Sequence, residues 1–399
     1  MTHSVAFTNI GSLITNDPTI GDGDLGEIKN AAIIVEDGKV AWVGSSSDVG
    51  SADAHHDLDG RTVIPGFVDS HAHLLFAGDR SEEFSSRMTG AAYSAGGIRS
   101  TVERTRLATD DQLRSNYLRL ISEMHRSGIT TFETKTGYGL TLNDEIRCLE
   151  IAAEQTSETT LLAAHVVPAE YADQPDAYVD LIINEMLPAA LGKARWVDVF
   201  CDRGAFTPDQ TDRILTAAAA TGFELRLHAN QLQAGSGISL GVKHGVASVD
   251  HCTYASDEDL DQLASSNTVA TLLPGAEFST RATYPSGRRF VDAGVKVAIA
   301  TDCNPGSSYT TSMPFCIAVA VRDMRLSPAE ALLAATRGGA AALRRTDVGH
   351  LGIGAQANFV SLNAPSYIHL AYRPGVDLIS QTFINGISVL TSHSHQEQQ

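Results

Sequence analysis

Long apolar stretches are missing from this sequence: none approaches the roughly 20 apolar residues that a membrane-spanning helix requires. The first residues, Met1 to Ser4, also lack the basic segment followed by an apolar run that marks a secretory signal. We therefore expect no membrane partner and no export, and we predict a cytoplasmic location for the protein.

Positive charge and cysteine are also scarce. Lys and Arg number 29 against 47 Asp and Glu, which gives a formal net charge of −18 at pH 7. So acidic a surface repels phosphate backbones, and no nucleic-acid partner is expected; a small anionic substrate would need its own local Arg or Lys. The five cysteines are odd in number and include no Cys-x-x-Cys pair, which indicates free thiols rather than a disulfide framework.

The length of 399 residues suits a barrel of about 250 residues with an appended domain. β-rich runs occupy both ends of the chain, and Asp37-Gly38 and Asn385-Gly386 are hairpin signals within them. We predict that residues 1–62 and 355–391 together build one small β-sandwich-like domain. The polar residues 392–399 are predicted to form a disordered tail.

The central segment, residues 63–354, alternates apolar runs with helical stretches such as Asp110–Ser127 and Ser327–Leu343. Because parallel strands need crossover helices, eight such units predict a (β/α)8 TIM barrel. Reacting groups in these barrels lie at the C-terminal ends of the strands, so polar residues there are candidate site residues. The eight runs are Val63–Asp69, Ile129–Lys135, Thr160–His165, Arg195–Val199, Phe223–His228, Ala247–His251, Thr268–Leu273 and Lys296–Asp302.

A pair of histidines, His71 and His73, follows the first run. Their period of two places both imidazoles on one side of an extended chain, where they can hold a divalent metal. The spacing alone is weak evidence, because His393 and His395 repeat it in the predicted tail. The buried strand that leads into His71 favours a metal site over chance polar residues in a loop.

Two further residues complete a predicted ligand set. His228 ends a strand-like run and is predicted as a third ligand, with a hydrogen-bonded structural histidine as the alternative. Asp302 is predicted as a ligand or proton shuttle, with a turn residue before Asn304-Pro305-Gly306 as the alternative. Three nitrogens and one oxygen leave a position open for water, as in a catalytic site.

The predicted cofactor is therefore one divalent metal ion per subunit, zinc or iron, although the same donors also suit nickel or cobalt. Such an ion lowers the pKa of its bound water to about 7 and so provides hydroxide at neutral pH. His251, at the end of the sixth run, is the candidate acid–base catalyst or carbonyl polariser, since imidazole titrates near neutrality. A structural histidine is the alternative.

The segment Pro65–His73 resembles the opening metal motif of the amidohydrolase superfamily. The histidines at the fifth and sixth runs and the aspartate at the eighth complete that pattern. Many members hold two metals bridged by a modified lysine on strand four, but Trp196–Cys201 contains no lysine. The resemblance therefore implies the mononuclear type.

A closer resemblance, over most of the chain, is to the imidazolonepropionase family. It is carried by Leu74–Arg80, Thr136–Leu140, Ala164–Tyr171, Leu273–Ala276 and Thr301–Gly306, which are far more specific than the metal ligands. It implies hydrolysis of the small anionic heterocycle 4-imidazolone-5-propanoate to N-formimidoyl-L-glutamate in histidine degradation, and a homodimer. It implies metal binding at His71, His73, His228 and Asp302 and substrate contacts at Arg80, Tyr93, Tyr138, His165, Asn304, Gly306 and Ser307.

Arg80 can offer the propanoate carboxylate a bidentate fork, with an ion pair to Glu82 or Glu83 as the alternative. Ser307 stands where the family often has threonine, and it keeps the hydroxyl.

One position departs from the family more seriously, because Gln231 stands where a glutamate is usual. An amide can orient a substrate or a water, but it cannot take a proton. We therefore assign the proton transfers to Asp302 and His251, with metal-bound hydroxide attacking the ring carbonyl and Gln231 orienting the reactants.

Three other functions remain open: another cyclic amidohydrolase, an aromatic deaminase of the same superfamily, and a non-catalytic barrel scaffold. Deaminases of this type generally use a glutamate after the strand-five histidine, so Gln231 counts against that function. A scaffold tends to lose metal ligands, whereas all four predicted positions are filled here. Ammonia release and the metal content of purified protein distinguish these functions.

Overall fold

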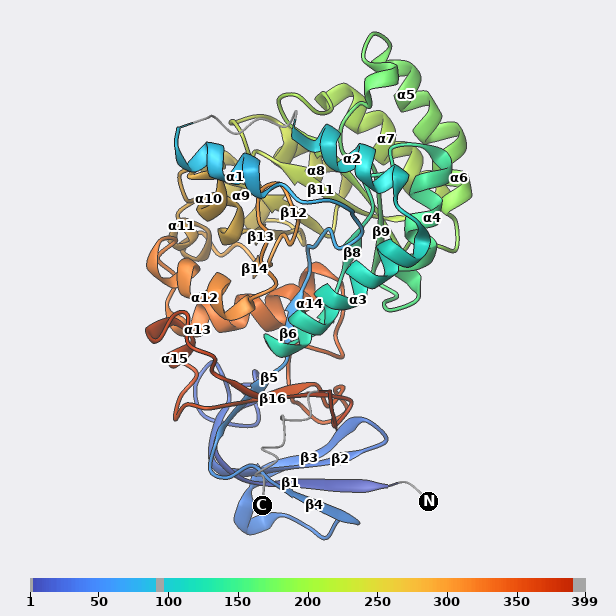
Figure 1. Cartoon of the computed structure of the whole chain (residues 1–399). Coiled ribbons are helices and arrows are strands. Elements are labelled where there is room, and N and C mark those ends of the chain that lie inside the picture. The colour runs from blue at the N-terminus through green and yellow to red at the C-terminus, as the bar shows by residue number, and fades with distance from the viewer. Residues whose placement is uncertain (1–2, 91–96, 390–399) are drawn as a thin grey trace.

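The computed structural model describes residues 3–90 and 97–389 (Figure 1). The predicted tail, residues 392–399, and the predicted substrate contact Tyr93 lie outside these described residues. In Figure 1 a barrel of strands and surrounding helices lies above a sheet to which both ends of the described chain contribute. No helix in residues 3–90 or 97–389 is long and apolar enough to cross a membrane.

The barrel strands are short, buried and ordered as in the sequence. Seven form a parallel sheet in the order β14-β13-β12-β11-β10-β9-β8, and β6 pairs with β7. Lys135 N donates to Ala72 O and Asp302 N donates to His71 O, each at 2.9 Å, so the two sheets join. The ring therefore closes into a TIM-like barrel, as the alternating runs predicted. The strands are β6 Phe67–Asp69, β7 Ile129–Phe132, β8 Thr134–Lys135, β9 Thr159–Ala164, β10 Trp196–Cys201, β11 Glu224–Ala229, β12 Ser248–His251, β13 Val269–Leu272 and β14 Val297–Ile299.

Helices surround the barrel and separate its strands, except β7 and β8, between which only Glu133 lies (Figure 1). The predicted helix Asp110–Ser127 corresponds to α3, which begins where the Thr109 hydroxyl accepts from Gln112 N. The predicted helix Ser327–Leu343 corresponds to α13, a π-helical turn at residues 334–338, and α14. The α-helices are α1 Ser81–Met88, α2 Ile98–Leu107, α3 Asp110–Arg126, α4 Leu142–Ala153, α5 Pro175–Leu181, α6 Leu187–Ala190, α7 Pro208–Thr221, α8 Gly237–His244, α9 Asp257–Ala264, α10 Pro274–Thr280, α11 Gly287–Asp292, α12 Met313–Arg322, α13 Pro328–Leu333, α14 Gly339–Ala342 and α15 His369–Tyr372.

The second sheet takes strands from both ends of the described chain. Its order is β17-β16-β15-β5-β1-β2-β3, with β4 also paired to β1. Both predicted hairpin turns are present, since Asp37-Gly38 joins β2 to β3 and Asn385-Gly386 joins β16 to β17, all with positive φ. The separation of this sheet as a sandwich domain stays a prediction. The strands are β1 Ser4–Ile14, β2 Glu27–Glu36, β3 Lys39–Ser45, β4 Ala54–Asp57, β5 Thr62–Pro65, β15 Phe359–Leu362, β16 Ile379–Ile384 and β17 Ile387–Ser388.

Each sheet has its own apolar core. In the terminal sheet the rings of Phe7, Phe359 and Phe383 pack together with centroids 4.5 to 5.3 Å apart, within the range of favourable aromatic pairs. In the barrel, the apolar side chains of the strands and of the surrounding helices form one large buried cluster. All five cysteines of the chain are buried free thiols.

The predicted first barrel run, Val63–Asp69, is divided between the two sheets. β5 pairs with β1 and β15 in the terminal sheet, whereas β6 pairs with β7 in the barrel. Gly66 separates them, and a Cβ atom there would lie only 2.2 Å from the hydroxyl oxygen of Thr130. The prediction of one continuous strand was therefore wrong, because the chain changes sheets at a residue that has no side chain.

Candidate active site

A pocket opens at the C-terminal ends of the barrel strands. The structure brings ten of the predicted site residues together in its lining, although they come from distant parts of the sequence. His71 is fully buried and contacts His73, while Gly306 lies beside Arg80. The ten are His73, Arg80, Tyr138, His165, His228, Gln231, His251, Asp302, Asn304 and Ser307.

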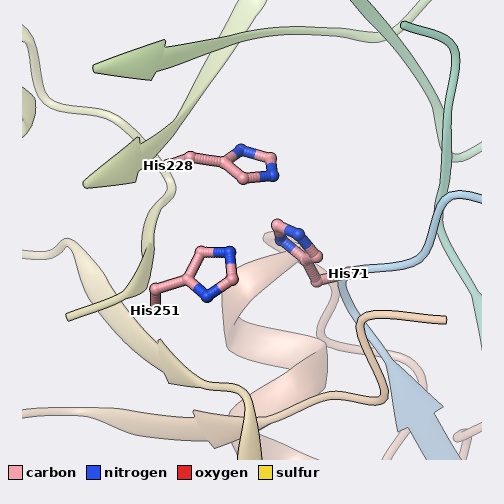
Figure 2. A group of neighbouring side chains, drawn as sticks. All are labelled: His71, His228 and His251. Carbon is pink, nitrogen blue, oxygen red and sulfur yellow. The ribbon is translucent and has the colours of Figure 1, made fainter. Parts of the chain in front are cut away.

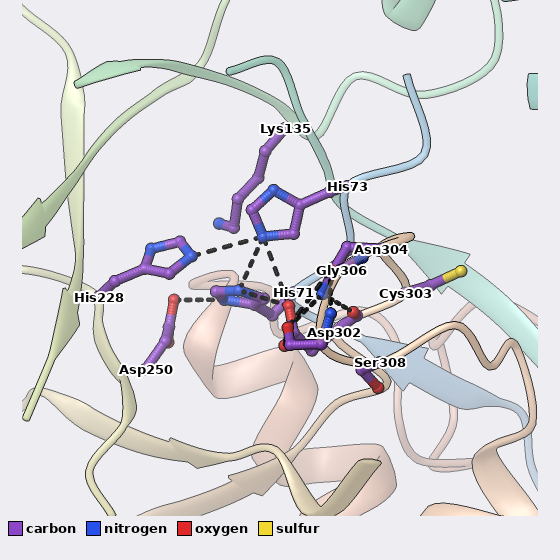
Figure 3. Close-up of polar contacts among 12 residues, drawn as sticks. His71, His73, Lys135, His228, Asp250, Asp302, Cys303, Asn304, Gly306 and Ser308 are labelled. Carbon is purple, nitrogen blue, oxygen red and sulfur yellow. Dashed lines mark hydrogen bonds and ion pairs between the residues drawn. The ribbon is translucent and has the colours of Figure 1, made fainter. Parts of the chain in front are cut away.

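Four donor atoms converge at this pocket, and Figure 3 shows His73 between the other three. His73 Nε2 lies 3.3 Å from His71 Nε2 and 3.4 Å from His228 Nε2. Asp302 Oδ1 lies 3.4 Å from His73 Nε2 and 3.5 Å from His71 Nε2. A tetrahedron whose corners lie about 2.1 Å from its centre has edges of about 3.4 Å, so these spacings match those between ligands of one divalent ion.

Two buried carboxylates orient two of these imidazoles. Asp250 Oδ2 lies 2.7 Å from His71 Nδ1, and Asp198 Oδ2 lies 3.0 Å from His228 Nδ1. A carboxylate at Nδ1 favours the tautomer with the proton on that nitrogen, so the Nε2 lone pairs of both rings point into the cluster. Lone pairs that face one another repel unless a cation or a proton lies between them. The donor set therefore fits a divalent metal.

Asp198 and Asp250 were not among the residues predicted from the sequence. Each is fully buried inside a barrel strand, Asp198 in the otherwise apolar β10 and Asp250 in β12 between Val249 and His251. A carboxylate buried in a barrel strand requires a partner in the interior, so this pattern is the signal that could have identified both residues.

A buried layer of opposite charge supports these carboxylates. Lys135 Nζ lies 2.9 Å from both Glu133 Oε1 and Asp198 Oδ2, and Arg226 Nη2 lies 3.4 Å from Asp250 Oδ2. Burial acts to lower the pKa of Lys135, but Asp198 and Glu133 outweigh it and raise that pKa above its usual value. Lys135 is therefore a cation that holds Asp198 against His228.

His251 lies beside the cluster at the end of β12 (Figure 2). Its ring centroid is 5.4 Å from that of His228 and 5.7 Å from that of His71, and these three imidazoles form an alternative group of possible metal ligands. Burial lowers the pKa of His251 to about 3, so the ring is neutral near pH 7. Its Nδ1 atom is buried and has no hydrogen-bond partner among the described residues.

Strained backbone accompanies the site. Asn230, His251 and Asp302 have φ angles of 54°, 76° and 51°. Such conformations cost about 1–3 kcal/mol each in residues other than glycine, and they concentrate at functional sites because the surrounding structure must enforce them. The backbone thus adopts a positive φ angle at or just after the ends of three barrel strands.

Arg80 lies at the edge of the pocket with a side chain that is 6% exposed. Its Nε donates to Glu83 Oε2 at 2.8 Å and its Nη2 donates to Glu83 Oε1 at 2.7 Å. The ion pair with Glu83, which the sequence offered as an alternative, is therefore present. The same arginine also lines the pocket.

Tyr138 and His165 form an aromatic wall. The His165 ring stacks on that of His73 with centroids 5.4 Å apart, and it lies 5.4 Å from the ring of Tyr138. Glu145 accepts three backbone N–H groups of residues 137–140 at 2.7 to 3.1 Å and so fixes the loop that carries Tyr138. His165 Nδ1 lies 2.9 Å from Gly137 O, which sets the orientation of its ring.

The loop after β14 is fixed around Asp302 by hydrogen bonds among its own residues (Figure 3). Asn304 Oδ1 accepts from the backbone nitrogens of Gly306 and Ser307, each at 2.8 Å, and Asn304 Nδ2 donates to Asp302 O at 2.7 Å. Ser307 Oγ donates to Asp302 Oδ2 at 3.3 Å. The second carboxylate oxygen of Asp302 is therefore oriented by a hydroxyl, while the first faces the imidazoles.

Gln231 lies just beyond β11 and lines the pocket. Asp202 Oδ2 accepts from the backbone nitrogens of Gln231 and Leu232, each at 2.8 Å. Asp202, which the sequence did not single out, thus anchors the segment that carries this departure from the family.

Glu277, on α10, is a further buried carboxyl near the pocket. It accepts from the Thr253 hydroxyl at 2.7 Å, and burial raises its pKa to about 8. Its stabilising contribution is present below its ordinary pKa of 4.5 and is lost as pH rises toward 8, by up to about 1.4 kcal/mol per pH unit. Between pH 5 and pH 8, Glu277→Gln should therefore gain unfolding free energy relative to wild type, as measured by urea denaturation.

The matched control is Glu185→Gln, at an exposed position remote from the pocket lining. Its unfolding free energy should stay parallel to that of wild type across the same pH range. A Glu277→Gln curve that also runs parallel to wild type would contradict the raised pKa.

Comparison with known proteins places this geometry in a family. The amidohydrolase family matches residues 62–389 of the chain. An imidazolonepropionase from Mycolicibacterium smegmatis is 61% identical over 383 residues, covering 96% of this chain and 97% of that protein. The chain belongs to the imidazolonepropionase family. Another imidazolonepropionase, from Streptomyces coelicolor, is 57% identical over 388 residues, covering 97% of this chain and 99% of that protein.

Solved structures of more distant proteins share the fold of this imidazolonepropionase-family chain. Guanine deaminase from C. acetobutylicum with bound guanine aligns with a TM-score of 0.72 and 17% identity, over 97% of this chain and 100% of that one. Atrazine chlorohydrolase from Arthrobacter aurescens TC1 complexed with zinc aligns with a TM-score of 0.71 and 20% identity, over 97% and 95%. At such identities the likeness shows the fold alone.

Proposed function

We propose that the chain hydrolyses 4-imidazolone-5-propanoate to N-formimidoyl-L-glutamate, a step of histidine degradation. The observation that carries the proposal is the convergence of four donor atoms, spaced 3.3 to 3.5 Å apart in the measured pairs, at a pocket that also holds an arginine. A cyclic amide with a carboxylate side chain needs both features, because its carbonyl must be activated and its charge must be received. The high identity to proteins named imidazolonepropionase supports the same substrate.

His71, His73, His228 and Asp302 would hold one divalent ion, for which we propose zinc or iron, because His73 Nε2 lies within 3.3 to 3.4 Å of a donor atom of each of the other three. When bound, such an ion polarises a carbonyl oxygen and lowers the pKa of a coordinated water. The buried carboxylates of Asp198 and Asp250 keep two of the imidazoles in the tautomer that ligation requires.

In this proposal one residue transfers the proton and another stabilises the developing charge. His251 is neutral, and a donor N–H on its ring stabilises the negative charge that develops on the substrate carbonyl oxygen. Asp302 receives the proton of the attacking water and delivers it to the ring nitrogen that leaves. One C–O bond forms and one C–N bond breaks, which yields the new carboxylate and the formimidoyl nitrogen of the product.

The remaining pocket residues bind and orient the substrate. Arg80 receives the propanoate carboxylate, and Tyr138 and His165 enclose the ring. Gln231 orients the ring amide without exchanging a proton. The other proposed substrate contacts are Asn304, Gly306, Ser307 and Tyr93, the last outside the described residues.

The direct test is the loss of 4-imidazolone-5-propanoate absorbance when the protein is added, with formimidoylglutamate as the product and no ammonia. Ammonia release from a purine or pyrimidine, without loss of the imidazolone, would contradict the proposal and favour an aromatic deaminase. A protein that purifies without metal and turns over neither substrate would instead be a scaffold.

Gln231→Glu should change kcat for the imidazolone by less than about tenfold, because Asp302 already provides the proton transfer and His251 the charge stabilisation. Steady-state rates between pH 6 and pH 9 measure this effect. Gln233→Glu is the control, since it adds the same charge at an exposed position on the same segment. A gain of about a hundredfold that is specific to Gln231→Glu would show that the site lacks a base.

We also propose that the protein is a homodimer, and that residues 1–62 and 355–391 form a separate β-sandwich-like unit. The support for the second point is that β5 and β15, which are far apart in sequence, pair directly in the terminal sheet. Sedimentation velocity on the purified protein measures the assembly state.

A further inference from the structure

Glu83 makes a bidentate contact with the arginine of the pocket. Its two oxygens accept from Arg80 Nε at 2.8 Å and from Arg80 Nη2 at 2.7 Å. The Arg80 side chain is 6% exposed and that of Glu83 is 30% exposed, so water screens this pair less than it screens an ordinary surface pair. The contact uses the Nε side of the guanidinium, and within residues 3–90 and 97–389 it leaves Nη1 without a hydrogen bond.

Two glycines leave room for the pair. A Cβ atom at Gly306 would lie 2.4 Å from Arg80 Nη1, and a Cβ atom at Gly97 would lie 2.3 Å from Arg80 Nη2 and 2.4 Å from a Glu83 oxygen. The backbone therefore approaches the guanidinium closely at Gly306 and at Gly97. A side chain at either position would displace the guanidinium. The planar group is held between Gly97, the loop of Gly306 and the Glu83 carboxylate.

The guanidinium edge that carries Nη1 lies beside Gly306, in a residue that lines the pocket. Arg80 lines the same cavity as His251, Asn304 and Ser307, and among the described residues no hydrogen bond from Nη1 is made. Arginine can bind two carboxylates at once, one through Nε and Nη2 and the other through Nη1 and Nη2. The first edge is occupied by Glu83, which leaves the second for a carboxylate that enters the pocket.

We propose that Glu83 is a positioning residue that fixes Arg80 for recognition of the substrate carboxylate and so makes the enzyme selective for rings that carry one. The inference rests on the proposed function. Since Glu83 cancels the charge of Arg80, the pair attracts anions weakly at a distance and acts through the direction of its free N–H groups. A preoriented fork favours a carboxylate at the correct distance from the reacting carbonyl over other anions.

The test compares two substrates in wild type and Glu83→Gln: 4-imidazolone-5-propanoate and the same ring with an ethyl group in place of the propanoate. For the propanoate, KM should rise about tenfold with kcat within about twofold, because binding loses its preoriented partner while the reacting groups stay in place. For the ethyl analogue neither constant should change. Glu82→Gln, one residue earlier and exposed, is the control and should behave as wild type with both substrates.

A double-mutant cycle with Arg80→Lys separates positioning from folding. If Glu83 acts through Arg80, Glu83→Gln should add less than about twofold to the KM of Arg80→Lys. An unchanged KM for the propanoate in Glu83→Gln, or an equal loss with the ethyl analogue, would overturn the inference while the proposed function stood. A wild-type protein that does not consume the propanoate would overturn both.

Discussion

Purified His228→Ala protein should carry less than about one tenth of the divalent metal of wild type, and its turnover should fall to background. The reason is geometric: His228 Nε2 is 3.4 Å from His73 Nε2, and its removal leaves three donors where four converge. Metal content by plasma mass spectrometry and the imidazolone absorbance assay, made on the same sample, measure both effects.

Asp198→Asn is the matched variant, because it leaves all four donors in place and removes only the carboxylate charge at His228 Nδ1. It should weaken metal affinity by about 10- to 100-fold, the range expected when a residue that supports a metal ligand is changed, with a milder loss of turnover. A His228→Ala protein with full metal content and full activity would refute the four-donor site.

The second large effect is expected at His251. His251→Gln should lower kcat by about a thousandfold, the size expected for loss of a positioned acid–base or polarising group, while the metal content stays at the wild-type level. Single-turnover rates and metal analysis of the same preparation separate the two properties.

The metal content also decides between two groups of donors. His71, His228 and His251 could hold an ion among themselves, as could His71, His73 and Asp302. Loss of metal in His251→Gln with retention in Asp302→Asn would assign the ion to the first group and contradict the roles proposed here. The reverse pattern is expected, because Asp302 and not His251 completes the edges near 3.4 Å.

The strand ends could be predicted from sequence, because a polar residue after a buried apolar run is a local signal. His71, His228, His251 and Asp302 all follow such runs, and the parallel barrel brings every run end to the same face. The hairpins at Asp37-Gly38 and at Asn385-Gly386 were equally local, since the two residues of each turn set the conformation.

Contacts across the barrel could not be predicted in the same way. Asp250 lies opposite His228 in strand register, yet its carboxylate contacts His71, which follows β6. That choice depends on the curvature of the sheet and on side-chain directions, neither of which is encoded in residue spacing. For the same reason the sequence offered two alternatives for Arg80, a position in the substrate site or an ion pair with a nearby glutamate. It did not show that one side chain would both line the pocket and make the ion pair.

The change of sheet at Gly66 has a consequence for how this protein can be dissected. A single residue separates β5, held by β15 from the far end of the chain, from β6, which leads into the first two histidines of the site. Cutting away the last strands would leave the terminal sheet frayed directly next to His71 and His73. We therefore expect that the barrel must be expressed together with the terminal sheet, and that a transplant of the metal site into another scaffold would have to include the terminal strands.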